Sequence, residues 1–114
     1  MDVIYLNYTL VSLRCLALAV YVDNVRIPWR GRKWCHLVAD STDELHDFAR
    51  ILGLKRAWFQ PNASYPHYDI TIETREIALR MGAIEGSRKE IIRCARKMKE
   101  EMCGVHVQQL SLLL

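Results

Sequence analysis

Side chains able to bind a metal ion or transfer protons lie near the ends of three predicted strands. Two of them, His67 and Asp69, are separated by one residue in an alternating segment, so they project from the same face of a strand. At this spacing they can share a metal ion, or the carboxylate can orient the imidazole. His36 lies on another predicted strand. If the protein is an enzyme, His36, His67 and Asp69 are therefore its catalytic candidates, with His67 as a general acid or base.

Two further acids follow predicted strands, Asp23 after the first and Asp40 after the second. The carboxyl ends of parallel strands form the edge at which ligands bind, so Asp23 and Asp40 converge there if these strands are parallel. With His67 and Asp69 they would form a metal site suited to Mg²⁺, Mn²⁺ or Zn²⁺. Such an ion activates water or clamps a phosphate, which makes metal-assisted phosphoester hydrolysis the reaction class that this set favours.

Each of these residues also has a purely structural explanation. Asp40 can help to cap the helix that follows it, Asp23 can belong to a turn, and His36 can be a core imidazole bonded to a backbone carbonyl. In that case the polar set is a hydrogen-bond network that fixes loops to the sheet, and no ligand binds.

A basic and aromatic segment precedes the second strand, and we expect it to be a loop, residues 25–33, that covers the polar pocket as a flap. Arginine and lysine neutralise phosphates while indole rings stack on bases, so the segment is typical of a nucleotide or single-stranded nucleic-acid contact. The net charge of +3 is far below that of dedicated nucleic-acid binders, which favours the alternative that the loop charges are solvated and Trp29 and Trp34 are packed into the core. The ligand-binding candidates are Arg26, Trp29, Arg30, Arg32 and Lys33.

Three strands are expected to position these groups. The nearly continuous apolar run at 16–22 is typical of a strand buried on both faces, and alternation predicts two more strands at 34–39 and 67–72. A short additional strand is predicted at 55–60.

Helices are expected between and after the strands. Capping boxes at Ser41–Glu44 and Ser87–Glu90 predict two helix starts, with the second helix ending near Met102, and a shorter helix is predicted over 74–81. This interleaving predicts a single layered α/β domain, with a small mixed or mostly parallel sheet covered by about three helices.

The length of 114 residues leaves room for one domain, which we assign to residues 19–103. Residues 1–18 are either an N-terminal extension or an added strand. Residues 104–114 form an apolar C-terminal tail. An apolar terminus usually packs on something, so the termini are candidate surfaces for a homodimer or a host protein partner.

No segment of the sequence is long and apolar enough to span a membrane, because the uncharged, largely apolar run at 3–13 is about half the roughly 20 residues needed. The four cysteines show no C-x-x-C spacing, which favours reduced and buried thiols over a zinc ribbon or a disulfide framework. We therefore expect a cytoplasmic protein without a membrane partner.

Several ordered blocks of the sequence resemble a known family. They are Val20-Tyr21-Val22-Asp23, the run from Trp34 to Ser41, Asp43-Glu44-Leu45-His46, and His67-Tyr68-Asp69-Ile70, with Ala83 and Ser87 after them. Over about residues 19–97 the chain is similar to DUF4031, a family of small bacterial and phage proteins of unknown function.

The resemblance implies no activity. It implies that the recurrent positions are Asp23, His36, Asp40, His46, His67 and Asp69. A phage origin would be in keeping with the family. The leading expectation is thus a polar pocket for a divalent metal ion or a phosphorylated, nucleotide-like ligand. The alternative is a non-catalytic phage-encoded interaction or inhibitor protein that binds a host protein or a nucleotide signal.

Overall fold

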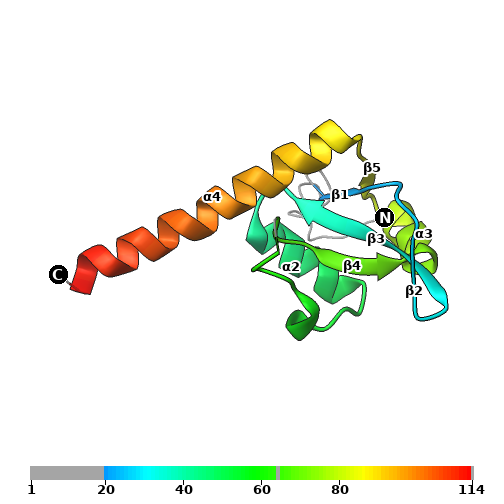
Figure 1. Cartoon of the computed structure of the whole chain (residues 1–114), viewed down its shortest axis with the longest axis horizontal. Coiled ribbons are helices and arrows are strands. Elements are labelled where there is room, and N and C mark those ends of the chain that lie inside the picture. The colour runs from blue at the N-terminus through cyan, green and yellow to red at the C-terminus, as the bar shows by residue number, and fades with distance from the viewer. Residues whose placement is uncertain (1–19, 64, 114) are drawn as a thin grey trace, which may run out of the picture.

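The computed structural model describes residues 20–63 and 65–113, with side chains described up to residue 104. These residues form one mixed five-stranded sheet with helices on both of its faces (Figure 1). The predicted α/β class, with a mixed sheet and three helices in a single domain, is confirmed. The elements in chain order are β1 (Val20–Val22), β2 (Ile27–Trp29), β3 (Arg32–Ala39), α2 (Thr42–Ile51), the 3₁₀ turn η2 (Arg56–Trp58), β4 (Tyr68–Thr71), α3 (Ile72–Arg80), β5 (Ile84–Glu85) and α4 (Arg88–Leu113).

The longest strand, β3, organises the sheet. It pairs in antiparallel fashion with β1, β2 and β4, while the short β5 runs parallel to β1. The register places Val22 opposite Leu37 and His36 opposite Asp69. Because directly paired residues project from the same face of a sheet, His36 and Asp69 are brought together by strand pairing alone.

The two faces of the sheet are covered differently. Tyr68 projects from the face opposite to Asp69, and its hydroxyl is hydrogen-bonded to His46 Nδ1 of α2 at 2.9 Å. Helix α2 therefore covers the face turned away from Asp69. Helix α4 covers part of the other face, where the buried Val38 of β3 and Ala95 of α4 line the same pocket. Figure 1 shows α4 crossing the sheet and then running out beyond the body of the domain. The part of that face carrying His36 and Asp69 stays partly open to solvent.

Both capping boxes are confirmed. The Ser41 hydroxyl accepts a hydrogen bond from the Glu44 amide at 3.2 Å at the start of α2. At the start of α4 the Glu90 carboxylate accepts from the Ser87 amide at 2.8 Å. These pairs satisfy first-turn amides that have no partner within the helix, which is why so short a sequence signal locates a helix start.

The prediction of a loop over 25–33 is wrong. The segment forms β2 and the beginning of β3, joined by a two-residue hairpin turn at Arg30 and Gly31, whose φ angles are 51° and 74°. Two consecutive positive φ angles are the signature of a turn that matches the twist of a hairpin. Pro28 is tolerated in β2 because a strand at a sheet edge can lack a donor on its open side.

Three other boundaries differ from prediction. Residues 55–60 contain a 3₁₀ turn and no strand. Helix α3 begins at Ile72, inside the predicted strand 67–72, because the Thr71 hydroxyl accepts from the Thr74 amide at 3.2 Å and caps the helix there. Helix α4 continues to Leu113, past the predicted end near residue 102.

Some predictions fall on parts of the chain that are not described. The predicted extension or added strand at 1–18 and the start of the strand at 16–22 lie outside the described residues. The side chains of the apolar tail that were expected to pack on a partner also lie outside them. None of the described helices is long and apolar enough to cross a bilayer.

Candidate metal centre

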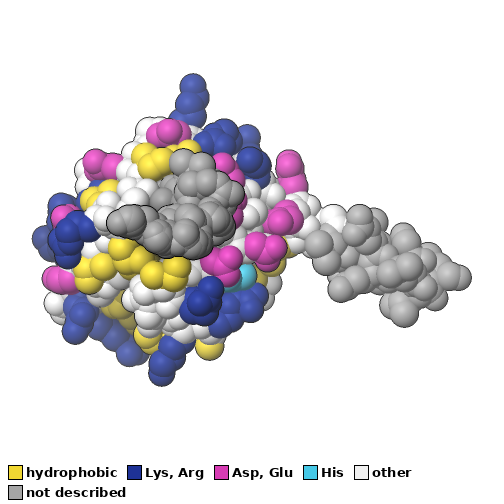
Figure 2. Space-filling view, turned by 180° about the vertical axis from the view of Figure 1, so that it is seen from behind, with side chains coloured by type: hydrophobic (Ala, Val, Ile, Leu, Met, Phe, Trp, Pro, Cys, Tyr) yellow, Lys and Arg dark blue, Asp and Glu magenta, His cyan; other side chains and the backbone are white. Residues whose placement is uncertain are grey.

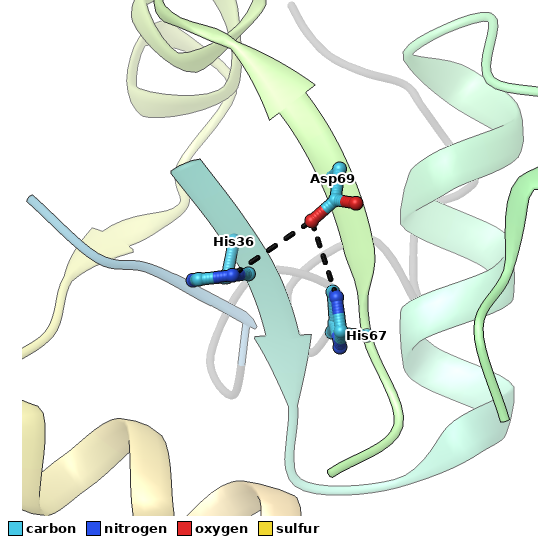
Figure 3. Close-up of side chains that lie close together, drawn as sticks. All are labelled: His36, His67 and Asp69. Carbon is cyan, nitrogen blue, oxygen red and sulfur yellow. Dashed lines mark ion pairs between the residues drawn. The ribbon is translucent and has the colours of Figure 1, made fainter. Parts of the chain in front are cut away.

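Three side chains converge on the open part of the sheet (Figure 3). The His67 Nε2 atom lies 3.1 Å from Asp69 Oδ1, and the His36 Nε2 atom lies 3.8 Å from the same oxygen. The two imidazole rings meet edge to face with their centroids 4.8 Å apart. Within the described part of the chain, this is the group of histidine, cysteine and acidic side chains whose ligand atoms lie close enough, within 4.8 Å of one another, to hold a metal ion.

Backbone pairing explains why these groups meet. His36 on β3 is paired directly with Asp69 on β4. His67 precedes β4 and forms an isolated bridge with Gln60, whose amide donates to the His67 carbonyl at 2.9 Å. This bridge extends the strand-like backbone by one residue, so that His67 and Asp69 share a face as predicted. The Gln60 side chain donates to Asp69 Oδ2, which leaves Oδ1 to face both imidazoles.

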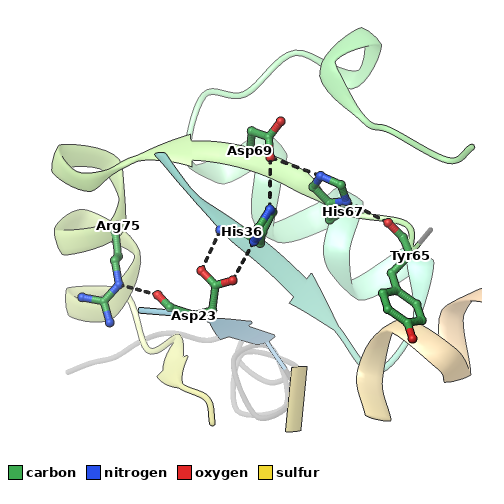
Figure 4. A network of polar contacts seen from close by, with 6 residues as sticks. All are labelled: Asp23, His36, Tyr65, His67, Asp69 and Arg75. Carbon is green, nitrogen blue, oxygen red and sulfur yellow. Dashed lines mark hydrogen bonds and ion pairs between the residues drawn. The ribbon is translucent and has the colours of Figure 1, made fainter. Parts of the chain in front are cut away.

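The Nδ1 atom of each imidazole is hydrogen-bonded to an acceptor on the side of the ring away from Asp69 (Figure 4). His36 Nδ1 lies 2.6 Å from Asp23 Oδ2, and His67 Nδ1 lies 2.7 Å from the Tyr65 carbonyl oxygen. A carboxylate and a carbonyl can only accept, so each Nδ1 carries the proton that it donates. In the neutral tautomers both Nε2 lone pairs are consequently directed toward Asp69. Histidine ligands of protein-bound metals are oriented in this way, by donating the second ring N–H to a carboxylate or carbonyl.

Asp23 is fixed from both sides. Its carboxylate also accepts from the His36 amide at 2.9 Å, and its carbonyl accepts from the buried Arg75 Nε at 2.8 Å. Arg75 in turn bonds Glu85 at 2.7 Å, which ties α3 and β5 to the loop after β1. Burial opposes ionisation of Asp23, but the hydrogen bonds from the His36 ring and amide outweigh it and lower the pKa of the carboxyl group.

The site attracts positive charge. The side-chain hydrogen bond to Asp23 raises the pKa of His36 above its usual value, against the opposing effect of burial, and Asp69 adds to the rise. Two imidazole lone pairs and a carboxylate oxygen directed at one point repel one another unless a proton or a cation lies between them. The side chains of His36 and Asp69 are 30% and 39% exposed, so an ion has access from solvent.

Comparison with known proteins adds one finding. A model of the family of proteins of unknown function DUF4031 matches residues 20–98. The chain belongs to the DUF4031 family. No curated protein and no solved structure matches it. The resemblance noted from the sequence is thus confirmed, and the matched range contains every residue of the polar cluster while assigning none of them a role.

In this DUF4031 protein Asp40 lies away from the cluster, so the prediction that it converges with Asp23 is wrong. Strands β1 and β3 are antiparallel, and Asp23 and Asp40 consequently follow opposite ends of the paired strands. Asp40 accepts from Arg93 at 3.2 Å and from Cys94 at 3.3 Å. It therefore fastens α4 to the end of β3. Asp23 does join the cluster, but behind His36, with its carboxylate occupied by that residue.

The basic and aromatic segment is divided between two clefts. Trp29 and Arg32 line a cleft of about 640 Å³ that Asp69 also borders. Arg26 and Lys33 line a separate, more polar cleft beside the start of α3, which Arg32 also reaches. Arg30 lies over the ring of Trp29 at 4.5 Å. On the face shown in Figure 2, the lysine and arginine side chains of the described residues lie at several separate places and are mixed with acidic ones.

The remaining histidine and cysteine candidates do not join the cluster. Burial lowers the pKa of His46, which bonds the Tyr68 hydroxyl behind the sheet. Burial raises the pKa of the Cys35 and Cys94 thiols to about 12, so both stay protonated and poorly nucleophilic. Cys35 and Cys94 are buried as predicted, whereas Cys103 is exposed.

Sequence reasoning missed two contributors to the site, Tyr65 and Gln60. Tyr65 acts through its carbonyl oxygen, for which no side-chain signal exists. The sequence pattern predicts Gln60 within a strand and indicates no role for it. The signal that could have located both is the loop 61–66, which carries a proline at each end and brings Gln60 back beside His67.

Proposed function

We propose that this DUF4031 protein binds a divalent transition-metal ion through His36 Nε2, His67 Nε2 and the Asp69 carboxylate. The observation that carries the proposal is that both Nδ1 atoms are engaged by acceptors while both Nε2 atoms face one carboxylate oxygen. Ligand atoms about 2.0–2.1 Å from a tetrahedral ion lie roughly 3.3 Å apart. The observed separations of 3.1 and 3.8 Å from Asp69 Oδ1 bracket that value.

The donor set narrows the choice among the ions expected from the sequence. Two imidazoles and a carboxylate suit Zn²⁺ or Mn²⁺, whereas Mg²⁺ prefers oxygen donors and keeps several waters. The same set of two histidines and one carboxylate holds non-haem Fe²⁺ in other proteins, so Fe²⁺ belongs among the ions to be titrated.

Three protein ligands leave positions open on the ion, which suits catalysis more than a closed structural site. A bound ion would lower the pKa of a water molecule, and the proposed reaction is hydrolysis of a phosphate ester. In that reaction the water oxygen bonds to phosphorus, the bond from phosphorus to the leaving oxygen breaks, and the leaving oxygen takes up a proton. In this proposal His67 is a metal ligand and not the general acid or base. Its Nδ1 donates to the Tyr65 carbonyl, and its Nε2, which faces Asp69, would bind the ion.

Calorimetric titration of Zn²⁺ into chelator-treated protein tests the metal site. We expect one ion per chain and loss of binding in His67→Ala. The matched control is His46→Ala, which removes a histidine that is bonded to Tyr68 behind the sheet. The absence of saturable heat, or equal affinity in wild type and His67→Ala, contradicts the proposal.

Hydrolysis of bis(p-nitrophenyl) phosphate tests the reaction separately. We expect metal-dependent release of p-nitrophenol that is lost in Asp69→Asn and retained in Asp40→Asn, whose carboxylate lies outside the cluster. Tight Zn²⁺ binding without turnover of this or other phosphate esters would contradict the hydrolase assignment and favour a non-catalytic binding protein.

A further inference from the structure

A cleft of about 640 Å³ lies beside the metal centre, with Asp69 on its wall. Its most prominent lining is aromatic, and two of the rings are about half exposed to solvent: Trp29 is 56% exposed and Trp58 is 51% exposed. Large exposed rings gathered in one hollow usually mark a binding site, since their burial in the protein's own core would be favourable. The aromatic residues that line the cleft are Trp29, Trp34, Trp58 and Phe59.

The rings come from two separate parts of the chain that both line the cleft. Trp29 and Trp34 belong to the β2–β3 hairpin, where they pack edge to face at 5.8 Å, and the Trp34 indole donates to the Trp29 carbonyl at 3.0 Å. Trp58 belongs to η2 and Phe59 follows it. The hairpin wall is thus held rigid by its own contacts, which reduces the entropy lost when a flat ligand enters.

The charge around the cleft complements an anion. Arg32 lines it directly. Other cations flank its aromatic rings, with Arg30 4.5 Å from the Trp29 centroid and Lys55 5.7 Å from the Trp58 centroid. The acid on the wall, Asp69, is the residue that the proposed metal ion would neutralise. A ligand with a flat ring and a negatively charged end therefore matches this cleft and its border.

We infer that the cleft binds a nucleotide unit, with the base among the indole rings and the phosphate directed toward Arg32 and the metal centre. Indole rings stack on any base because every base has a π-face, and a cleft of this volume falls within the range of small-ligand sites. The base end of this inference stands on the cleft alone. The phosphate end rests on the proposed metal site.

The test is a titration of AMP, adenosine and inorganic phosphate into the full chain, with Zn²⁺ present and with chelator. Zn²⁺ is expected to strengthen binding of AMP and to leave binding of adenosine unchanged. Trp58→Ala is expected to weaken both AMP and adenosine by roughly 5- to 150-fold, the effect of removing one stacking partner. Trp58→Phe, which keeps an aromatic ring, is expected to stay within a few-fold of wild type.

Matched controls separate these effects from changes of fold. Ile51→Ala removes an apolar residue that is 50% exposed and lies outside the lining of the cleft, so its affinities are expected to be unchanged. Arg32→Ala is expected to weaken binding of AMP more than binding of adenosine. Lys33→Ala, which alters the neighbouring polar cleft, is expected to leave the ratio of the two affinities unchanged. Circular dichroism of each variant confirms that the sheet is intact.

The outcomes for the two proposals are distinct. Zn²⁺ binding without AMP or adenosine binding, or equal nucleotide affinity in wild type and Trp58→Ala, overturns the nucleotide inference and leaves the metal site standing. Adenosine binding that depends on Trp58 without any Zn²⁺ binding supports the cleft and overturns the proposed function. A 5′-phosphorylated oligothymidylate is titrated beside AMP. Tighter binding of AMP indicates a free nucleotide as the ligand, whereas tighter binding of the oligothymidylate indicates the end of a strand, and either result supports a nucleotide unit.

Discussion

Replacing Asp23 by asparagine tests how the metal centre is prepared, without removing any of its ligands. The Asp23 carboxylate uses one oxygen for the His36 ring at 2.6 Å and the other for the His36 amide at 2.9 Å. An asparagine has one acceptor oxygen. If that oxygen stays on the His36 amide, the new NH₂ group faces Nδ1, which must then accept and lose its proton. The proton moves to Nε2 and occupies the position that a metal ion needs.

Loss of such an outer partner typically costs 10- to 100-fold in metal affinity, which corresponds to about 1.4–2.8 kcal/mol. We therefore predict that Asp23→Asn binds Zn²⁺ at unchanged stoichiometry with a Kd raised by roughly this factor. The assay is competition against a chromophoric zinc chelator. Asp40→Asn is the matched control, because it makes the same substitution after a neighbouring strand where the carboxylate contacts Arg93 and Cys94. Wild-type affinity in Asp23→Asn, or an equal loss in Asp40→Asn, would refute the role given to Asp23.

Two further predictions concern the metal-free protein. The pKa of Asp23 is lower in the folded protein than its unfolded value of 3.8, so this carboxylate contributes stability above pH 3.8, and the contribution is lost as the pH falls through the folded pKa. The pKa of His36 is higher in the folded protein than its unfolded value of 6.5. This imidazole therefore contributes stability that is complete below pH 6.5 and is lost as the pH rises through the folded pKa. In urea unfolding with chelator present, the free energy of unfolding of wild type should therefore exceed that of Asp23→Asn by about 1.5–3 kcal/mol near pH 5.5 and by less at pH 9. A difference that grows with pH would disprove the pairing of Asp23 with His36. In native protein at pH 8, peptide mapping after iodoacetamide should find Cys103 alkylated well before Cys35 and Cys94, whose burial and pKa of about 12 protect them, and rapid labelling of either buried thiol would contradict the fold.

The local part of the site could be predicted from the sequence. Alternation in the segment 67–72 was sufficient to place His67 and Asp69 on one face, because the period of a strand is fixed by its backbone. The capping boxes located the starts of α2 and α4, because a cap is completed within four residues.

The rest depended on strand pairing, which a local pattern does not encode. Whether β1 and β3 run parallel or antiparallel decides whether Asp40 joins Asp23, and the chain between the two strands gave no unambiguous indication. Pro28 and Gly31 suggested a loop, although the same residues suit an edge strand and a tight hairpin turn. The acceptor behind His67 is a backbone carbonyl, which any residue at position 65 would supply.

Anomalous diffraction from a crystal of the full chain soaked with Zn²⁺ tests the proposed metal centre most directly. Data collected on both sides of the zinc absorption edge locate the ion without reference to any assumed ligand. We predict one strong peak at about 2.0–2.2 Å from His36 Nε2, His67 Nε2 and an Asp69 oxygen, with Asp23 and the Tyr65 carbonyl still bonded to the two Nδ1 atoms. A map with no peak there, or with zinc bound only at other side chains, would contradict it.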